Sequence, residues 1–105
     1  MSQNVLLLKA RRIEYLSRLD EDIFFEWLGK VACVSGIEGV GDELQVTVSI
    51  NKVDDACLRE LLAIFFRYQI SMKQLEVFRD DQKRKWFSDV EAYWYSKVFV
   101  GNEEV

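Results

Sequence analysis

Carboxylates are the residues of this 105-residue chain whose spacing could support chemistry, and they gather at two places. The first is the segment LDEDIFFEWLGKV and the second begins just after Val53. The two clusters consist of Asp20, Glu21, Asp22 and Glu26, and of Asp54, Asp55 and Glu60. Such clusters can bind a divalent cation or exchange protons with a substrate. Helix capping explains the same positions without a reaction, since acids are favoured in a first helical turn.

The residues that other kinds of catalytic site require are absent from the chain. The chain has no histidine, the commonest general base and metal ligand, so a Ser-His-Asp or Cys-His site cannot be built. Neither GxxxxGK[ST] nor GxGxxG occurs, and Gly36, Gly39 and Gly41 lie in a predicted hairpin rather than between a strand and a helix. We therefore expect a non-enzymatic protein with no cofactor and no metal site.

The cysteines and the hydropathy indicate a cytoplasmic protein. Cys33 and Cys57 form no CxxC motif, which favours two buried, reduced thiols, with a disulfide as the alternative. No run approaches the ~20 apolar residues that span a bilayer, and Val5–Leu8 is too short for a signal-peptide core. We expect no membrane association.

Acidic charge is concentrated on one predicted surface. The net charge of −4 disfavours binding to nucleic acid and permits a basic partner. The predicted first helix and the hairpin turn hold acids that only Lys30 offsets nearby. An acidic face can bind a basic protein in a fast, salt-sensitive association. The candidate partner-binding acids are Asp20, Glu21, Asp22, Glu26, Glu38, Asp42 and Glu43.

The C-terminal quarter adds aromatic side chains to this candidate surface. Residues 83–85 are basic and precede Trp86 and Phe87, a pattern that can stack on a nucleic-acid strand. Flanking acids largely cancel the local field, which favours a solvated turn. Since Trp is a favoured interface anchor, Trp86 and Trp94 are candidate partner contacts, although aromatic residues of this kind more often lie in the core.

Segment Val53–Phe78 carries the strongest helix signal. Asp54 is the predicted N-cap, and Val53 stands where a hydrophobic staple would reach the first helical turns. The apolar positions that recur with helical spacing are Leu58, Leu61, Leu62 and Phe65. After this helix we expect a final strand over Lys73–Arg79, with a short helix capped by Ser71 as the competing prediction.

Four elements are expected before that segment. Alternation of Ile13, Tyr15 and Ser17 predicts a first strand within residues 10–19, with a helix as the alternative. The VLLL run before it could open a strand or pack as a tail. A helix capped by Asp20 follows, with Leu19 and Phe24 at its staple positions. Its buried stripe is predicted to be Phe24, Trp27, Leu28 and Val31. Strands are expected over residues 32–38, where Gly36 either weakens the strand or marks a bulge, and over residues 44–50.

The order β-α-β-β-α-β predicts an α+β, ferredoxin-like sandwich with both helices on one sheet face. We expect one domain over residues 1–105, with a core of about 11–79. The extension, residues 80–105, is rich in aromatics and is predicted to contain a helix begun by Asp89.

Three blocks resemble a family of small bacterial cytosolic proteins: LDEDIFFEWLGKVACV, LRELLAIFFRYQISMKQLEVF and WFSDVEAYWYSKVF. The similarity covers most of residues 19–99 and includes the patterns FFEWL and AYWxxxVF. Such proteins are associated with immunity in contact-dependent inhibition and related polymorphic toxin systems. The resemblance implies a stoichiometric binder that neutralises a cognate toxin domain, often a nuclease with a basic cleft. A small regulatory or oligomerising domain of unknown ligand, including a homo-oligomer, remains the alternative.

Overall fold

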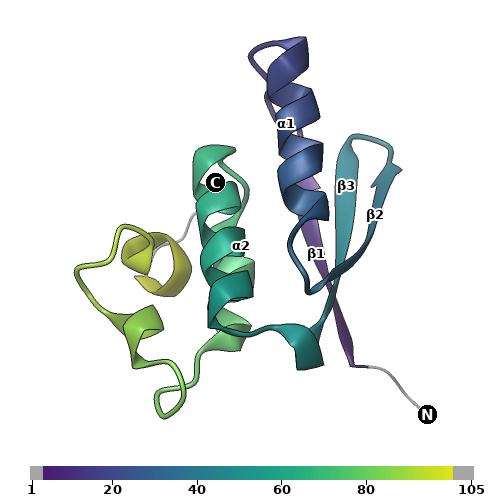
Figure 1. Cartoon of the computed structure of the whole chain (residues 1–105). Helices are drawn as coiled ribbons and strands as arrows, with labels where there is room; N and C mark the ends of the chain where they lie inside the picture. The colour runs from purple at the N-terminus through teal and green to yellow at the C-terminus, as the bar shows by residue number, and fades with distance from the viewer. Residues whose placement is uncertain (1–3, 101–105) are drawn as a thin grey trace. The chain divides into compact units, whose positions relative to one another are not determined.

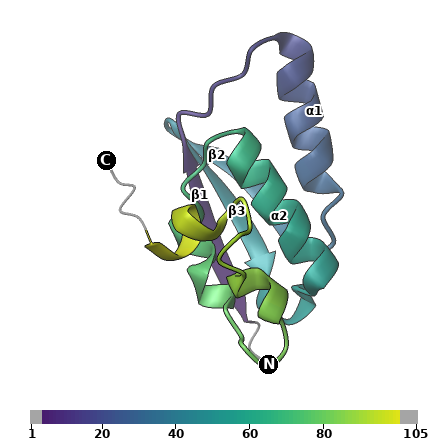
Figure 2. The ribbon, with the colours of Figure 1, turned by 90° about the vertical axis from the view of Figure 1, so that its left-hand side faces the viewer.

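A three-stranded antiparallel sheet with two helices on one face forms the first part of this computed structural model, as Figure 1 and Figure 2 show. The structure describes residues 4–100 and divides them into unit one, which ends at Ile70, and unit two, which begins at Ser71. Unit one contains β1 (Val5–Arg11), α1 (Arg18–Gly29), β2 (Val34–Val40), β3 (Glu43–Ser49), η1 (Ile50–Lys52) and α2 (Asp55–Arg67). The expected α+β class is confirmed.

The sheet has the strand order β1-β3-β2, so β3 is its central strand. The alternation predicted for β3 is confirmed, because Val46 and Val48 are buried beneath the helices while Thr47 faces the other way. The bulge predicted at Gly36 coincides with a shift of register between β2 and β3. Gly41, at φ +64°, makes the hairpin turn in a left-handed conformation that suits glycine.

The start of the chain differs from the prediction. Strand β1 ends at Arg11, so the VLLL alternative is right and the strand expected within residues 10–19 is wrong. Helix α1 is capped by Ser17, not Asp20: the Ser17 hydroxyl accepts a 3.1 Å bond from the Asp20 amide. Asp20 then accepts a 2.8 Å bond from the Leu16 amide. This pair of bonds resembles a capping box and moves the helix start toward the N-terminus.

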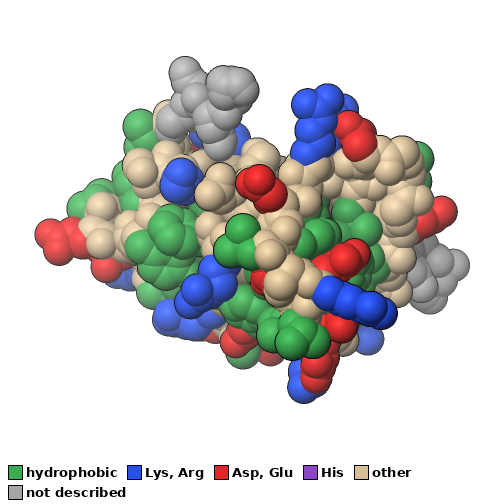
Figure 3. Space-filling model, turned by 90° about the horizontal axis from the view of Figure 1, so that it is seen from above, with side chains coloured by type: hydrophobic (Ala, Val, Ile, Leu, Met, Phe, Trp, Pro, Cys, Tyr) green, Lys and Arg blue, Asp and Glu red, His purple; other side chains and the backbone are tan. Residues whose placement is uncertain are grey.

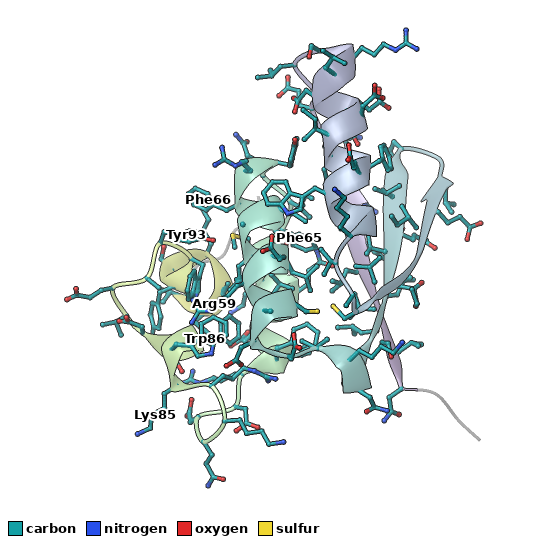
Figure 4. The ribbon with its side chains drawn as sticks, viewed as in Figure 1. Arg59, Phe65, Phe66, Lys85, Trp86 and Tyr93 are labelled. Atoms are coloured by element: carbon teal, nitrogen blue, oxygen red, sulfur yellow. The ribbon has the colours of Figure 1, made fainter. Side chains whose placement is uncertain are left out.

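Helix α2 follows its sequence signals closely. Asp54 is the N-cap, and its carboxylate accepts a 2.9 Å bond from the Cys57 amide. All of the predicted apolar positions are buried, together with Ile64. The successive side chains of Phe65 and Phe66 leave the helix in different directions (Figure 4), and only Phe65 is buried. Gln69 and Ile70 end the helix in a Schellman motif, in which their backbone N–H groups donate to the carbonyls of Phe66 and Phe65.

The expected final strand over Lys73–Arg79 is wrong, and the competing helical prediction is closer. Unit two begins instead with a 3-10 helix, η2 (Met72–Phe78), although the Ser71 side chain does not cap it. Met72, Leu75 and Phe78 are all buried. They recur at every third residue, which is the period of a 3-10 helix and not of a strand. Within residues 4–100 the β-α-β-β-α-β series therefore lacks its last strand.

The rest of unit two consists of turns and short helices. They are η3 (Lys85–Ser88) and η4 (Ser96–Val100), a π-helix. The helix expected to begin at Asp89 is wrong, because residues 90–94 form turns and only the end of that segment is helical. A single domain with a core of about 11–79 remains a prediction, and the structure divides the described residues into two compact units after Ile70. Among the described residues, no helix combines the length and apolar character needed to cross a bilayer.

Candidate functional site

The acids predicted to bind a partner do not form one uniform surface. Asp20 is half-buried and fully engaged: its two carboxylate oxygens accept bonds from the Leu16 amide and, at 2.8 Å, from the Tyr68 hydroxyl. These two donors hold the pKa of Asp20 below its usual value, with the Leu16 amide as the larger cause. Asp20 therefore joins the start of α1 to the end of α2.

Sheet pairing neutralises the acids of the hairpin. Arg11 faces Glu43 in the β1–β3 register and forms a 3.4 Å ion pair with it, while Arg12 contacts Asp42 at 3.1 Å. The prediction that only Lys30 offsets the acidic surface is therefore wrong. The sequence could not show these ion pairs, because β1 and β3 are far apart along the chain and meet only in the folded sheet. The Gln45 amide and then Arg11 lower the pKa of Glu43, and Arg12 does the same for Asp42.

The remaining predicted acids are better placed to meet a partner. Glu26 forms a 3.4 Å ion pair with Lys30 on the exposed side of α1. The exposed side chains of Glu21, Asp22 and Glu38 form no hydrogen bond or ion pair with other described residues. Because Glu21, Asp22 and Glu26 share one helix, the acidic surface that survives is the outer part of α1.

A feature that the sequence reasoning missed lies beside these acids. Leu16, Leu19 and Ile23 are 88%, 70% and 55% exposed. Leu19 and Ile23 are four residues apart and share one face of α1, whereas Phe24 and Leu28 face the core. We call Leu16, Leu19 and Ile23 the α1 ridge. In the sequence, this ridge corresponds to a second apolar stripe on the helix. The predicted buried face followed the stronger stripe through Phe24, and the second stripe was not considered.

A polar hollow of about 390 Å³ lies in unit one and is lined by residues that follow β1, begin α1 and end α2. Leu16 of the α1 ridge also lines this hollow, so the two features are continuous. Figure 3, which views the molecule from above, shows acidic, basic and apolar side chains interspersed rather than a patch of one charge sign. The hollow is lined by Arg12, Glu14, Leu16, Asp20, Arg67, Tyr68 and Gln69.

Tyr68 is a hydrogen-bond donor within the hollow, and its ring packs on the core. Burial, and then the adjacent Asp20 carboxylate, raises the pKa of the Tyr68 hydroxyl, so it stays protonated and donates to Asp20. The ring of Tyr68 packs against Phe24 at 4.8 Å between centroids, which anchors it to the core of unit one. Arg67 and Glu14 have no hydrogen bond or ion pair with other described residues, so their charges remain available.

The aromatic candidates of unit two have different environments. Trp94 is buried, and its indole N–H donates a 2.8 Å bond to the carbonyl of Phe87. Its ring meets that of Trp86 edge-on at 5.7 Å. Trp94 therefore belongs to the core of unit two and is not an exposed anchor, whereas Trp86 is half-buried. A core position was the open alternative for both residues.

The basic residues of unit two lie in a turn. Asp80 accepts backbone bonds from Gln82 and Lys83, which folds the segment back on itself. Arg84 donates to the carbonyl of Phe78 at 2.8 Å, so its charge serves the fold of the unit. Lys85 points away from the ribbon (Figure 4). This arrangement agrees with the predicted solvated turn.

The two cysteines are free, buried and close to each other in unit one, as predicted for reduced thiols. Burial, with Cys57 nearby, raises the pKa of the Cys33 thiol to about 12. Over residues 4–100, no group of three or more cysteine or carboxylate side chains is arranged to hold a metal ion. The thiols therefore behave as part of the core.

No protein-family model matches the chain, and no curated protein or solved structure is similar to it.

Proposed function

We propose that this chain is a non-enzymatic protein-binding module, and specifically an immunity protein that binds and neutralises a toxin domain. The observation that carries the proposal is the α1 ridge. Three large apolar side chains project from one helix and from the residue before its cap, at positions that the core does not use. Contiguous exposed apolar side chains rimmed by polar residues are typical of protein interaction sites.

The charges around the ridge favour a basic partner. Asp22 and Glu26 lie on α1 beside Leu19 and Ile23, and Glu21 adds a further carboxylate to the same helix. Apolar contacts would supply most of the affinity, while the acids would speed association and select the partner. The same combination fits a toxin domain with a basic cleft, the partner class that the resemblance to immunity proteins implies.

The experiment that tests this proposal is co-expression with the protein domain encoded by the neighbouring gene, which an immunity role predicts to be toxic. The wild-type chain should restore growth and copurify with the toxin in a one-to-one complex. The double variant L19D/I23D should lose both effects, because it places charge at the centre of the apolar contact. The matched control is V90D, since Val90 is also exposed but lies in unit two. Both variants should retain the wild-type circular dichroism spectrum and melting temperature.

Two results would contradict the proposal. One is a toxin that kills cells equally well with and without the wild-type chain. The other is full protection by a folded L19D/I23D variant, which would remove the ridge from the interface. A mass in solution that is a multiple of the 12.4 kDa chain, abolished by L19D/I23D, would instead favour the oligomerising domain.

A further inference from the structure

We infer that the polar hollow of unit one binds a carboxylate group, with Arg67 as its main contact and Arg12 as a second guanidinium. This inference goes beyond the proposed function and does not rest on it, because the hollow is built entirely from residues 12–69. A volume of about 390 Å³ lies within the range of pockets that hold small molecules or single side chains.

Hydrogen bonds already present determine which groups remain for a ligand. Asp20 accepts from Leu16 and Tyr68, so its carboxylate is occupied. Arg12 donates a hydrogen bond from Nε to Asp42, so its terminal N–H groups remain available to a ligand. The Arg67 side chain donates no hydrogen bond to the described residues. A guanidinium presents parallel N–H groups that match the two oxygens of a carboxylate. The hollow therefore offers more unused donors than acceptors.

Arg67 lines the hollow next to Tyr68. Its positive charge lowers the pKa of the Tyr68 hydroxyl, against the larger effects of burial and of Asp20. Arg67 is the last residue of α2, where a cation is favoured by the carbonyl end of the helix. A bound carboxylate would meet this guanidinium beside the Tyr68 oxygen.

The backbone bends into strained conformations at two lining residues. Arg12 has φ +53° and Gln69 has φ +58°, the left-handed region that residues other than glycine rarely adopt. These two are the only described non-glycine residues with positive φ, and both line the hollow. The conformation of Gln69 belongs to the Schellman motif that ends α2, so it is the left-handed Arg12 that supports a ligand site, where strained residues are enriched. The Gln69 side-chain amide is a further donor without a partner among the described residues.

Two lining residues, Glu14 and Asp20, carry carboxylates that oppose the binding of an anion, and Glu14 provides a sign test. Its side chain has no hydrogen bond or ion pair with the described residues, and its charge should repel a ligand carboxylate. Removing its charge should therefore strengthen binding, whereas removing the charge of Arg67 should weaken it. A merely structural role for these side chains would not give effects of opposite sign.

The test is a titration of the full chain, followed by NMR, at constant ionic strength. One probe is sodium succinate, a free small carboxylate. The other is the capped peptide acetyl-Gly-Asp-Gly-amide, which carries a carboxylate on a protein-like chain. Saturable shifts are expected at the amides of Tyr68 and Gln69 and at the Arg67 side chain. R67Q should weaken binding by about tenfold or more. E14Q should strengthen it about twofold.

The matched control is R18Q, which makes the same charge change at an exposed residue outside the hollow and should leave binding unchanged. Each variant should keep the wild-type amide spectrum away from the hollow. Binding of succinate alone assigns the site to a small molecule, and binding of the peptide alone assigns it to an acidic side chain of a protein partner. If neither probe gives saturable shifts, or if R67Q binds both as well as wild type, the inference is overturned.

Discussion

The hydroxyl of Tyr68 donates a 2.8 Å hydrogen bond to the carboxylate of Asp20, across 48 positions of sequence. The bond ties the end of α2 to the first turn of α1, and the Tyr68 ring packs edge-on against Phe24 beneath it. The indole of Trp27 adds a second link, a 2.9 Å bond to Glu60. One of the acids expected to bind a partner is therefore part of the helix–helix contact.

Asp20 should make the stability of the protein depend on pH in the acid range. Its pKa is lowered in the folded state, chiefly by the Leu16 amide and then by Tyr68. Its stabilising effect is therefore fully present above the pKa of an unfolded aspartate, about 4, and is lost as the pH falls through the folded pKa. Urea unfolding from pH 6 to about 2 should be less pH-dependent for D20N than for wild type.

The control for that measurement is D22N, because Asp22 is exposed on the same helix and its side chain has no hydrogen bond with the described residues. D22N should keep the wild-type pH dependence. Equal pH profiles for D20N and wild type would mean that the bonds of Asp20 do not persist in solution.

Two leucine substitutions should distinguish the core from the α1 ridge. L61A removes a fully buried side chain of α2 and should lower the free energy of unfolding by about 2–5 kcal/mol. L19A removes the same atoms from a side chain that is mostly exposed, and should change it by less than about 0.5 kcal/mol. Urea unfolding at pH 7 measures both. A large loss in L19A would show that the ridge is buried in solution and would contradict the proposed binding surface.

Q69G should stabilise the protein. Gln69 follows the C-cap of α2 in a Schellman motif, in which Ile70 N–H bonds to Phe65 carbonyl at 2.9 Å and Gln69 N–H to Phe66 carbonyl at 3.4 Å. Glycine adopts this left-handed conformation without the steric cost that Gln incurs. The expected gain is about 0.5–1 kcal/mol, measured as a higher urea midpoint.

The opposite substitution provides the comparison. Gly41 has φ +64° and an added Cβ would meet no atom within 4 Å, so G41A tests the backbone conformation alone. It should destabilise the protein by about 1 kcal/mol. If Q69G and G41A change stability in the same direction, the left-handed conformation of one of these residues is not retained in solution.

Cys33 should be inert toward thiol reagents in the folded protein. Only about one molecule in ten thousand carries the Cys33 thiolate at pH 8, because its pKa is raised to about 12 and the thiolate is the reactive form. Ellman's reagent should therefore modify the native chain very slowly at pH 8 and both cysteines rapidly in urea. C33A should leave a native protein that is equally unreactive, because Cys57 is buried too. Rapid labelling of native Cys33 would contradict this burial.

Local patterns were sufficient where one signal dominated. The cap at Asp54 and the buried stripe of α2 could be read directly, because both depend on residues within a few positions of each other. The alternation in β3 was equally clear. The prediction of a final strand was wrong because a short apolar run does not by itself distinguish a strand from a 3-10 helix. In this segment the buried residues Met72, Leu75 and Phe78 are spaced by three, as in a 3-10 helix.

The sequence by itself determined the α+β class, the second helix, the hairpin and the burial of both thiols, because each follows from local periodicity, turn chemistry or composition. Only the tertiary structure decided which charges remain unpaired and which apolar residues remain exposed. Arg11 meets Glu43 through strand pairing, and Leu19 is exposed because Phe24 and Leu28 take the side of α1 that faces the core. The α1 ridge and the hollow around Arg67 therefore depend on contacts between residues far apart in the chain, which no local pattern specifies.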